Sequence, residues 1–190
     1  MENKIQAYFD ALAPRWDQMC SHDQEKIHRI LDACAIAPTD RVLDIACGTG
    51  VLAPYLRERN PAAVTAIDLS PQMIARAREK HPEGVRFLCG DVLELRGETF
   101  DVCIVYSAFP HFLEPERLIQ KAWELLSPGG RLVVAHSQSR AQINAVHGGS
   151  ASEISMGLME ASRLQSLMEP LFTVTERIDN EEMYLVRGVK

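Results

Sequence analysis

The sequence predicts an α/β fold: a doubly wound seven-stranded sheet, mostly parallel with a C-terminal antiparallel hairpin, and helices on both faces. Apolar runs alternate with amphipathic segments from residue 42 to residue 136, which is typical of parallel strands joined by helices. A glycine-rich turn at residues 48–50 follows the first run and precedes a helical segment. Two last strand-like runs, residues 171–178 and 182–189, flank Asp179-Asn180 and predict the hairpin.

The strands are predicted from apolar runs, and the helices from the segments between them. Ser70 and Pro71 predict a helix start, because serine is a common N-cap and proline fits the first turn. Pro82 and Gly84 predict that the same helix ends near residue 81. The five strands expected before the hairpin are residues 42–46, 64–67, 85–89, 100–106 and 131–136, and the helices are residues 51–59, 70–81, 115–126 and 154–168.

Two helical segments are predicted before the first strand. Residues 5–19 are expected to form one amphipathic helix, or two short ones broken near Pro14, and residues 23–35 to form the next. The apolar face of the first segment is expected to carry Tyr8, Phe9, Leu12 and Trp16.

The composition is that of a globular protein, with 46% hydrophobic and 24% charged residues among 190. A net charge of −6 disfavours binding to nucleic-acid phosphates, so we expect no nucleic-acid partner. No apolar stretch is long enough to span a bilayer, and the first residues lack a signal-peptide pattern. Five cysteines without paired spacing argue against a disulfide framework. We therefore expect a cytoplasmic protein without a membrane partner, whose oligomeric state the sequence does not predict.

Three aspartates, Asp44, Asp68 and Asp91, lie at or just after the ends of three successive predicted strands. Ligands of open α/β sheets bind outside these carboxyl ends. For any one aspartate alone, capping of a neighbouring turn or helix explains its position about as well. All three at equivalent positions, with the glycine turn between them, predict a ligand that has hydroxyl groups, an amine and a positive centre.

Five segments carry a recognisable pattern, namely Val42–Gly50, Ala66–Ile74, Cys89–Leu93, Phe100–Val105 and Leu126–Leu132. In this order they resemble the motifs of class I S-adenosylmethionine-dependent methyltransferases. Their sequences are most similar to those of the ubiquinone/menaquinone-biosynthesis type. The resemblance implies a Rossmann-like fold and S-adenosyl-L-methionine as the cofactor. It also implies methyl transfer by in-line displacement to a small-molecule acceptor whose nucleophilic atom the sequence does not identify.

The resemblance further implies a role for each matching residue of the cofactor site. Asp68 would bind both ribose hydroxyls, and Asp91 would accept a hydrogen bond from the adenine amino group. Core packing is an equally good explanation for Met73 taken alone. The other implied contacts are Asp44, Ala46, Gly48 and Gly50 for the methionine part, Leu69, Met73 and Val92 for the adenine, and Tyr106 and Ser107 beneath the sulfonium.

The acceptor side is predicted from the demands of the reaction. The sulfonium already activates the methyl group, so the protein must mainly align a nucleophile and, where that nucleophile is protonated, supply a base. His111, His136 and Tyr106 are the candidate catalytic residues, although His111 could instead order its loop. Arg140 could clamp a carboxylate or phosphate, and His147 lies in the same polar stretch.

That stretch, residues 136–149, has a simpler explanation as a polar surface connection. The histidines of this region lack the spacing of metal ligands, so no metal is expected. N-terminal helices often cover the substrate in the family that the sequence resembles. Residues 1–36 are therefore expected to form a lid that includes Phe9 and in which Tyr8 and Trp16 touch substrate, and residues 37–190 to form the methyltransferase domain. Packing of these three aromatic residues on the sheet is the alternative.

Two other functions stay open. Gly48 to Ala53 fits the looser dinucleotide pattern, and Asp68 stands at a fitting distance, so an NAD-dependent oxidoreductase is one alternative. Asp44, Asp91 and the hairpin have no role in that reading. A non-catalytic cofactor-binding scaffold is the other alternative, because a fold does not establish turnover.

Overall fold

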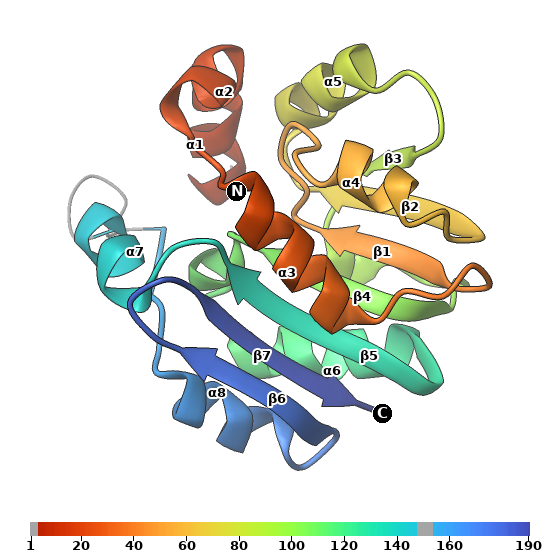
Figure 1. Ribbon diagram of the computed structural model, residues 1–190. Helices are drawn as coiled ribbons and strands as arrows, with labels where there is room; N and C mark the ends of the chain where they lie inside the picture. Colours follow the sequence, from red (N-terminus) through yellow and green to blue (C-terminus); the bar gives the residue numbers. More distant parts are fainter. Residues whose placement is uncertain (1–3, 148–153) are drawn as a thin grey trace.

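Figure 1 shows the computed structural model, which describes residues 4–147 and 154–190. Within these residues, seven strands form one sheet in the order β3-β2-β1-β4-β5-β7-β6. The pairs among β1 to β5 are parallel, and β7 pairs antiparallel with both β5 and β6. The predicted fold class is confirmed. The strands are β1 (Arg41–Ile45), β2 (Ala63–Asp68), β3 (Arg86–Cys89), β4 (Phe100–Tyr106), β5 (Leu126–His136), β6 (Thr173–Asp179) and β7 (Tyr184–Val189).

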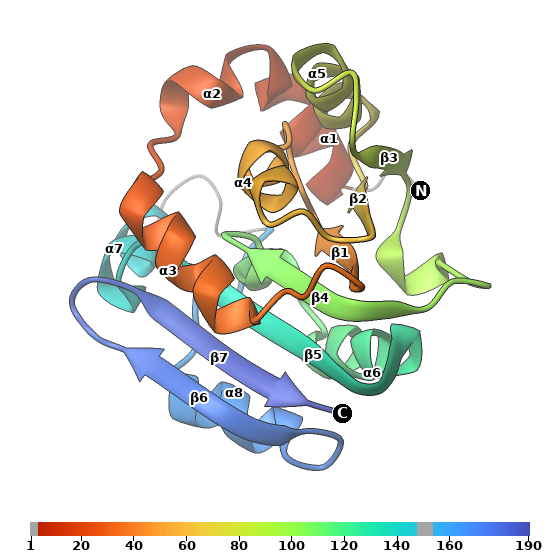
Figure 2. The same ribbon diagram turned by 45° about the vertical axis from the view of Figure 1, so that its right-hand side comes forward.

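Helices cover both faces of the sheet, with α3 and α4 on one face and α6 and α8 on the other (Figures 1 and 2). The α-helices are α1 (Lys4–Leu12), α2 (Trp16–Met19), α3 (Gln24–Cys34), α4 (Ala53–Glu58), α5 (Pro71–Lys80), α6 (Pro115–Leu125), α7 (Arg140–His147) and α8 (Ala161–Met168). Three short 3-10 turns, η1 (Ala13–Arg15), η2 (Val92–Glu94) and η3 (Phe109–His111), complete the described elements. None of the helices in the described part of the chain has the length and apolar character needed to cross a membrane.

The core has two layers because successive side chains of a strand point to opposite faces. Val42 of β1 packs in a cluster with Ile30 of α3, whereas the next residue, Leu43, packs in a cluster with Leu118 of α6. All four side chains are buried. This double burial explains why the parallel strands appear in the sequence as continuous apolar runs.

The predicted helix at residues 154–168 is wrong in its first half, because α8 begins only at Ala161. Gly157 has a φ of +73°, which no helical residue adopts. The side chain of Asn144 holds the adjoining backbone, since its Oδ1 accepts from the Leu158 N–H (2.6 Å) and its Nδ2 donates to the Leu158 carbonyl (3.0 Å). The predicted strand at residues 131–136 also starts earlier, at Leu126, directly after α6.

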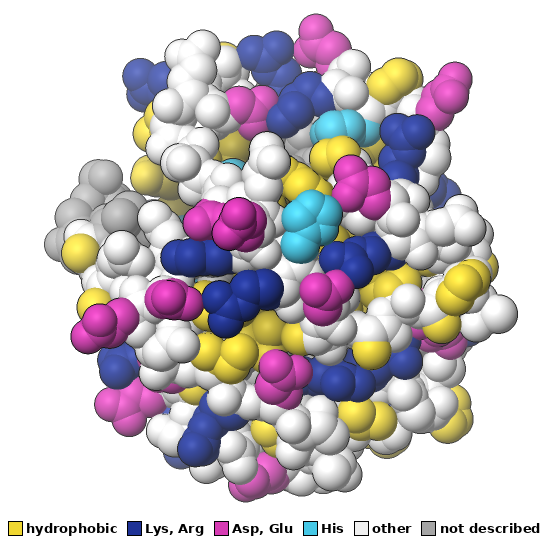
Figure 3. All heavy atoms as spheres, in the orientation of Figure 1, with side chains coloured by type: hydrophobic (Ala, Val, Ile, Leu, Met, Phe, Trp, Pro, Cys, Tyr) yellow, Lys and Arg dark blue, Asp and Glu magenta, His cyan; other side chains and the backbone are white. Residues whose placement is uncertain are grey.

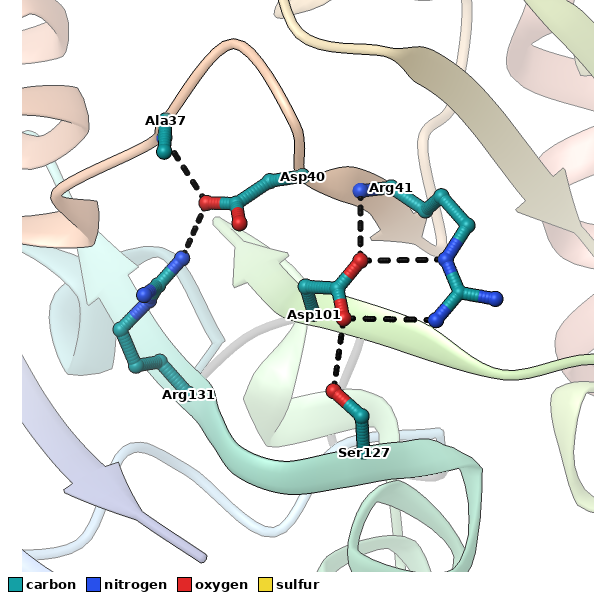
Figure 4. Close-up of polar contacts among 6 residues, drawn as sticks. All are labelled: Ala37, Asp40, Arg41, Asp101, Ser127 and Arg131. Carbon is teal, nitrogen blue, oxygen red and sulfur yellow. Dashed lines mark hydrogen bonds and ion pairs between the residues drawn. The ribbon is translucent and has the colours of Figure 1, made fainter.

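Ion pairs join the amino-terminal ends of the central strands, opposite the ends at which ligands bind in such sheets (Figure 4). Asp101 of β4 accepts hydrogen bonds from the Arg41 backbone N–H (2.9 Å), the Arg41 guanidinium (3.1 and 3.3 Å) and the Ser127 hydroxyl (2.6 Å). Asp40 forms an ion pair with Arg131 of β5. The Arg41 guanidinium holds the pKa of Asp101 well below its ordinary value. These contacts fix the register of β1, β4 and β5 at one end.

Candidate functional site

A cavity of about 370 Å³ opens at the carboxyl ends of β1, β2 and β4, and α1 and α2 border it. Most of the residues predicted for a cofactor site meet here, although the chain places them far apart. The predicted residues that line the cavity are Trp16, Ala46, Gly48, Asp68, Leu69, Met73, Asp91, Val92, Ser107 and His111.

The glycine turn after β1 depends on left-handed backbone conformations. Ala46, Gly48 and Gly50 have φ angles of +56°, +55° and +81°. Gly48 lines the cavity, and its N–H donates to Asp68 Oδ2 (2.8 Å). Gly50 faces α5 instead, since a Cβ there would lie 3.0 Å from His81 Cδ2. The structure therefore places Gly50 at a helix contact and not, as the resemblance implied, on the cavity wall.

Asp68 is an acid of the cavity wall whose two carboxylate oxygens each accept a backbone hydrogen bond. Its Oδ2 accepts from the Gly48 N–H, and its Oδ1 accepts from the Ser70 N–H (2.9 Å). Burial raises the pKa of Asp68, and the two backbone donors partly offset this rise. Because each carboxylate oxygen has two lone-pair directions, the group can accept further hydrogen bonds from a ligand. Its orientation is fixed before any ligand binds.

The other two predicted acids differ from Asp68. Asp44 is only 2% exposed and does not line the cavity. Its burial, with a smaller contribution from Asp68, raises the pKa of its carboxyl group to about 8. Asp91 lines the cavity, and its Oδ1 also accepts from the Leu93 N–H (2.9 Å). Asp91 therefore both caps η2 and lies on the cavity wall, so the two explanations considered in the sequence analysis are compatible.

Aromatic rings of the N-terminal helices cover the cavity. Phe9 packs edge to face against Trp16, with centroids 5.5 Å apart, and against His111, with centroids 4.9 Å apart. Tyr8 packs on Phe9 at 5.4 Å but does not line the cavity. Tyr8 therefore contacts another aromatic residue of α1, whereas Trp16 lies on the cavity wall. Sequence analysis included Phe9 in the predicted lid, and the structure places it on the cavity wall.

Two aspartates of the N-terminal helices fasten these helices to the loops after β1 and β2. Asp10 accepts from the Ser70 hydroxyl (2.5 Å) and from the Gln72 N–H (3.2 Å). Asp17 accepts from the Thr49 hydroxyl (2.5 Å) and from the Lys80 ammonium group (2.9 Å). Figures 1 and 2 show α1 and α2 beside α5, in agreement with these contacts. The helices that cover the cavity are therefore held by the loops that form it.

Several predicted acceptor-side residues lie elsewhere. His136 is fully buried at the end of β5, where its ring packs edge to face on Tyr184 with centroids 6.0 Å apart. Arg140 forms ion pairs with Asp179 (3.1 Å) and Glu160 (3.8 Å), so these acids engage the guanidinium that was expected to clamp an anion. Neither residue lines the cavity. The side chain of His147 lies outside the described part of the structure.

Tyr106 is buried behind the cavity wall instead of lining it. Its hydroxyl donates to Ser137 Oγ (2.7 Å) and lies 3.0 Å from His22 Nδ1. The neighbouring Ser107 has a φ of +53° and lines the cavity. Sequence analysis missed His22 and included Ser137 only within the polar stretch of residues 136–149, because no local spacing links the end of β4 to two separate loops.

His111, a candidate catalytic residue, lies on the cavity wall in η3. Its Nδ1 is 3.0 Å from the Ile154 carbonyl oxygen and must carry a proton to donate to it. Nε2 is then the basic nitrogen of the neutral ring. Among residues 4–147 and 154–190, no three His, Cys, Asp or Glu side chains are grouped so that they could hold a metal ion.

The wall also contains residues that sequence analysis did not assign. Arg117 lies at the edge of the cavity and pairs with Glu114 (2.5 Å). Apolar residues from α1, the loop after β3 and the segment around η3 contribute the rest of this part of the wall. They include Ile5, Leu93, Ala108, Phe112 and Leu113.

Comparison with known proteins gives a consistent result. A family model described as a methyltransferase domain matches residues 43–134. Demethylmenaquinone methyltransferase of Thermus thermophilus is 37% identical over 137 residues, which are 66% of this chain and 62% of that protein. Malonyl-[acyl-carrier protein] O-methyltransferase of Priestia megaterium is 40% identical over 95 residues, which are 48% of this chain and 35% of that protein. The chain thus spans less than two thirds of either relative.

A solved structure supports the fold over the whole chain. N-methyltransferase NodS of Bradyrhizobium japonicum, in complex with S-adenosyl-L-homocysteine, superposes with a TM-score of 0.77. The alignment covers 99% of each chain at 18% sequence identity. At this identity the likeness is one of architecture.

Proposed function

The chain belongs to the class I S-adenosylmethionine-dependent methyltransferases, and we propose that it transfers a methyl group from S-adenosyl-L-methionine to a small-molecule acceptor. The observation that carries the proposal is the meeting of Gly48, Asp68 and Asp91 around one cavity under aromatic residues of the N-terminal helices. In an open α/β sheet this is where a ligand binds.

The residues present fit this cofactor. The carboxylate of Asp68, held by two backbone N–H groups, suits the pair of ribose hydroxyls. Leu69, Met73 and Val92 offer apolar surface to the adenine, and Asp91 lies beside them on the same wall. The buried Asp44 lies beneath the glycine turn, where a positively charged ligand would favour its ionised form.

Bound S-adenosyl-L-methionine would supply an activated methyl group. The protein then needs to hold the acceptor in line with that group and to exclude water. Phe9 and Trp16 cover the cavity and are suited to the second task. We therefore propose that residues 1–36 act as the lid and residues 37–190 as the methyltransferase domain, with the lid anchored through Asp10 and Asp17.

A neutral acceptor suits the cavity better than an anionic one. Arg117 is the one Lys or Arg residue among the described residues of the wall, and Glu114 already neutralises it. Arg140 is engaged by acids elsewhere. Conversion of the cofactor to S-adenosyl-L-homocysteine should therefore be faster with 1,4-naphthohydroquinone or a neutral amine than with a malonyl thioester. Faster turnover of the malonyl thioester would contradict this choice.

The cofactor assignment is tested by calorimetric titration of S-adenosyl-L-methionine, S-adenosyl-L-homocysteine and NAD into the wild type and Asp68→Asn. The two adenosyl ligands should bind the wild type, and the variant should lose at least about 1.5 kcal/mol, roughly tenfold in affinity, because a charge-assisted hydrogen bond is removed. Asp32→Asn is the matched control, since Asp32 is an exposed residue of α3 that forms an ion pair with Arg59.

Thermal unfolding of both variants checks that they fold. Binding of NAD alone would replace the methyltransferase proposal with the oxidoreductase alternative. If all three ligands fail to bind the wild type, the proposed cofactor site is wrong.

A further inference from the structure

Phe9 is the aromatic residue of the cavity wall that contacts two others. Its ring packs edge to face on Trp16, with centroids 5.5 Å apart, and on His111, with centroids 4.9 Å apart. The three residues come from three different elements, namely α1, α2 and η3, and all of them line the cavity. The Phe9 ring is half-buried by these contacts. It therefore takes up space inside the site as well as covering it.

These rings lie at the end of the cavity to which the methionine part of the donor is assigned. A Cβ on Gly48 would lie 3.7 Å from Trp16 Nε1, so the indole packs over the glycine turn. The family resemblance assigns the methionine part of the donor to this turn. On the other side, His111 lies in η3, which follows the cavity residue Ser107 at the end of β4. The Phe9 ring is therefore close to the place where the methyl group would be presented.

The cavity has room for about one ligand. Its volume of about 370 Å³ is near the lower end of the roughly 300–1,000 Å³ that bury a single drug-sized ligand. Methyl transfer requires donor and acceptor in the site at the same time, with the reacting atoms in contact. A donor that extends from Gly48 along Asp68 to Asp91 leaves little space for a second molecule. A part of the wall therefore has to move when the acceptor enters.

The N-terminal helices are the part of the wall that is easiest to displace. Neither α1 nor α2 has a fully buried residue, and polar contacts of Asp10 and Asp17 fasten them to the loops. In contrast, η3 buries Phe109 and Pro110 in the core. Movement of η3 would expose these apolar side chains to water, which costs far more than exchanging exposed hydrogen bonds with solvent. The residue of α1 that has to make room is Phe9.

We propose that the Phe9 ring occupies the acceptor's place beside the methyl group, and that the acceptor enters by displacing this ring. The inference rests on the proposed function, because it needs a methyl donor in the cavity. Before the acceptor arrives, the ring keeps water away from the methyl group. Once bound, the acceptor takes over the contacts of the ring with Trp16 and His111. Phe9 is therefore a specificity-determining residue for the acceptor.

The surroundings of the ring indicate which part of the acceptor takes its place. Trp16 and His111 make edge-to-face contacts there, and Ala108 and Phe112, which flank His111 in the chain, add apolar surface to the same wall. Such surroundings favour an aromatic ring, whereas a charged group would lose its hydration without compensation. The acceptor is therefore expected to present a flat, uncharged ring to the site.

Acceptor binding without turnover tests the displacement. The probe is 1,4-naphthohydroquinone, titrated calorimetrically under anaerobic conditions into protein saturated with S-adenosyl-L-homocysteine. Phe9→Ala should bind the probe about two- to tenfold more tightly than the wild type, because the probe no longer has to break an aromatic pair before it enters. Binding that is no tighter than in the wild type, including no binding to either protein, would overturn the inference.

Phe112→Ala is the matched control, since it removes a ring of the same size from the same cavity, but from the segment directly after η3. This variant should bind the probe no more tightly than the wild type. Tighter binding by both variants would overturn the inference, because any enlargement of the cavity would then be sufficient. Thermal unfolding checks that both variants fold.

Fluorine NMR follows the ring itself in a protein that keeps its aromatic side chains. 4-Fluorophenylalanine is placed at position 9, and S-adenosyl-L-homocysteine is bound first. Addition of 1,4-naphthohydroquinone should move the signal toward the chemical shift that the label has in the unfolded protein. The same label in place of Phe172, which is buried in the core, should not respond. A position 9 signal that does not move toward the unfolded value would overturn the displacement.

Calorimetry with S-adenosyl-L-homocysteine alone separates this inference from the proposed function. If the ligand fails to bind the wild type, the proposed function is wrong and the role of Phe9 with it. If the ligand binds the wild type, the cofactor site stands. The titrations with 1,4-naphthohydroquinone then decide the role of Phe9 alone.

Discussion

At the scale of single residues, Asp44 illustrates how position determines charge. It lies in β1, a strand buried on both faces, and burial raises the pKa of its carboxyl group from 3.8 to about 8. Asp68, only one strand away, meets two backbone donors that partly offset the same effect. The two acids therefore have different properties, although the sequence presents them as equivalent ends of two strands.

This difference predicts how the stability of the free protein depends on pH. Since the folded-state pKa of Asp44 lies above its unfolded value, ionisation favours the unfolded state, and the protein loses stability as pH rises from near 4 to near 8. Asp44→Asn should remove this loss, so thermal unfolding should show a smaller decline over that range. S-adenosyl-L-homocysteine should bind the variant more weakly. A decline as steep as in the wild type would refute the buried-acid explanation, with Asp32→Asn as the surface control.

At the scale of elements, α1 and α2 act on the site through a few polar contacts. Asp10 and Asp17 each bind a hydroxyl group from a loop that also shapes the cavity, namely Ser70 and Thr49. Arg76 of α5 adds a hydrogen bond to the Pro14 carbonyl (3.0 Å). Because helices this short are marginal on their own, tertiary contacts such as these have to hold them in place.

Weakening one of these contacts should speed ligand release. Asp17 is half-exposed, so the loss of its contact to Lys80 should cost about 1 kcal/mol or less. Asp17→Asn should therefore raise the dissociation rate of S-adenosyl-L-homocysteine by up to about fivefold. Stopped-flow fluorescence of Trp16 on the cavity wall can measure this rate in a Trp123→Phe background.

The control for this measurement is Glu25→Gln, an exposed residue in the first turn of α3. High salt should accelerate release in the wild type and the control more than in Asp17→Asn, because salt screens an exposed ion pair. Equal release rates in all three proteins would mean that this contact does not hold the helices closed.

At the scale of the whole molecule, the cavity lies at one end of the sheet, and ion pairs join the central strands at the other end. Asp101 and Asp40 tie β1, β4 and β5 together at the end away from the cavity (Figure 4). Over the face that carries α3 and α4, acidic and basic side chains are interspersed (Figure 3). Exposed pairs such as Arg29 with Glu182 contribute little to stability, so the partly buried contacts of Asp101 matter more.

The ion pair of Asp101 with Arg41 predicts how the stability of the protein changes in acid. Because the folded-state pKa of Asp101 lies below its unfolded value, its contribution is present above pH 3.8 and is lost as pH falls through the folded-state pKa. Asp101→Asn should lower the free energy of unfolding at neutral pH by roughly 1–3 kcal/mol. The difference from the wild type should shrink in acid, as measured by denaturant unfolding at several pH values.

Glu182→Gln, which removes an exposed ion pair on another edge, should change stability far less. A constant difference between Asp101→Asn and the wild type from neutral pH to strong acid would show that the charge of Asp101 is not the cause.

Local patterns in the sequence predict the layered α/β architecture and the loops that border the cavity. Burial on both faces makes the parallel strands continuous apolar runs, and local demands place Gly48 at a turn and Ser70 at a helix start. Each of these sequence signals lies within a few residues of the strand, turn or helix start that it specifies. For the same reason the sequence predicts that Asp68 and Asp91, which directly end or follow their strands, lie at one end of the sheet, where both line the cavity.

Contacts between side chains that lie far apart in the sequence could be identified only in the folded molecule. In the structure, His136 and Arg140 lie away from the cavity, and Gly50 faces α5. His22 contacts Tyr106, from which it is separated by 84 positions in the sequence. Strand β7 also lies between β5 and β6. Such contacts depend on the packing of distant elements, and no local spacing encodes them. The conformational preferences of the chain are local, whereas the site is built from side chains that only the completed sheet brings together.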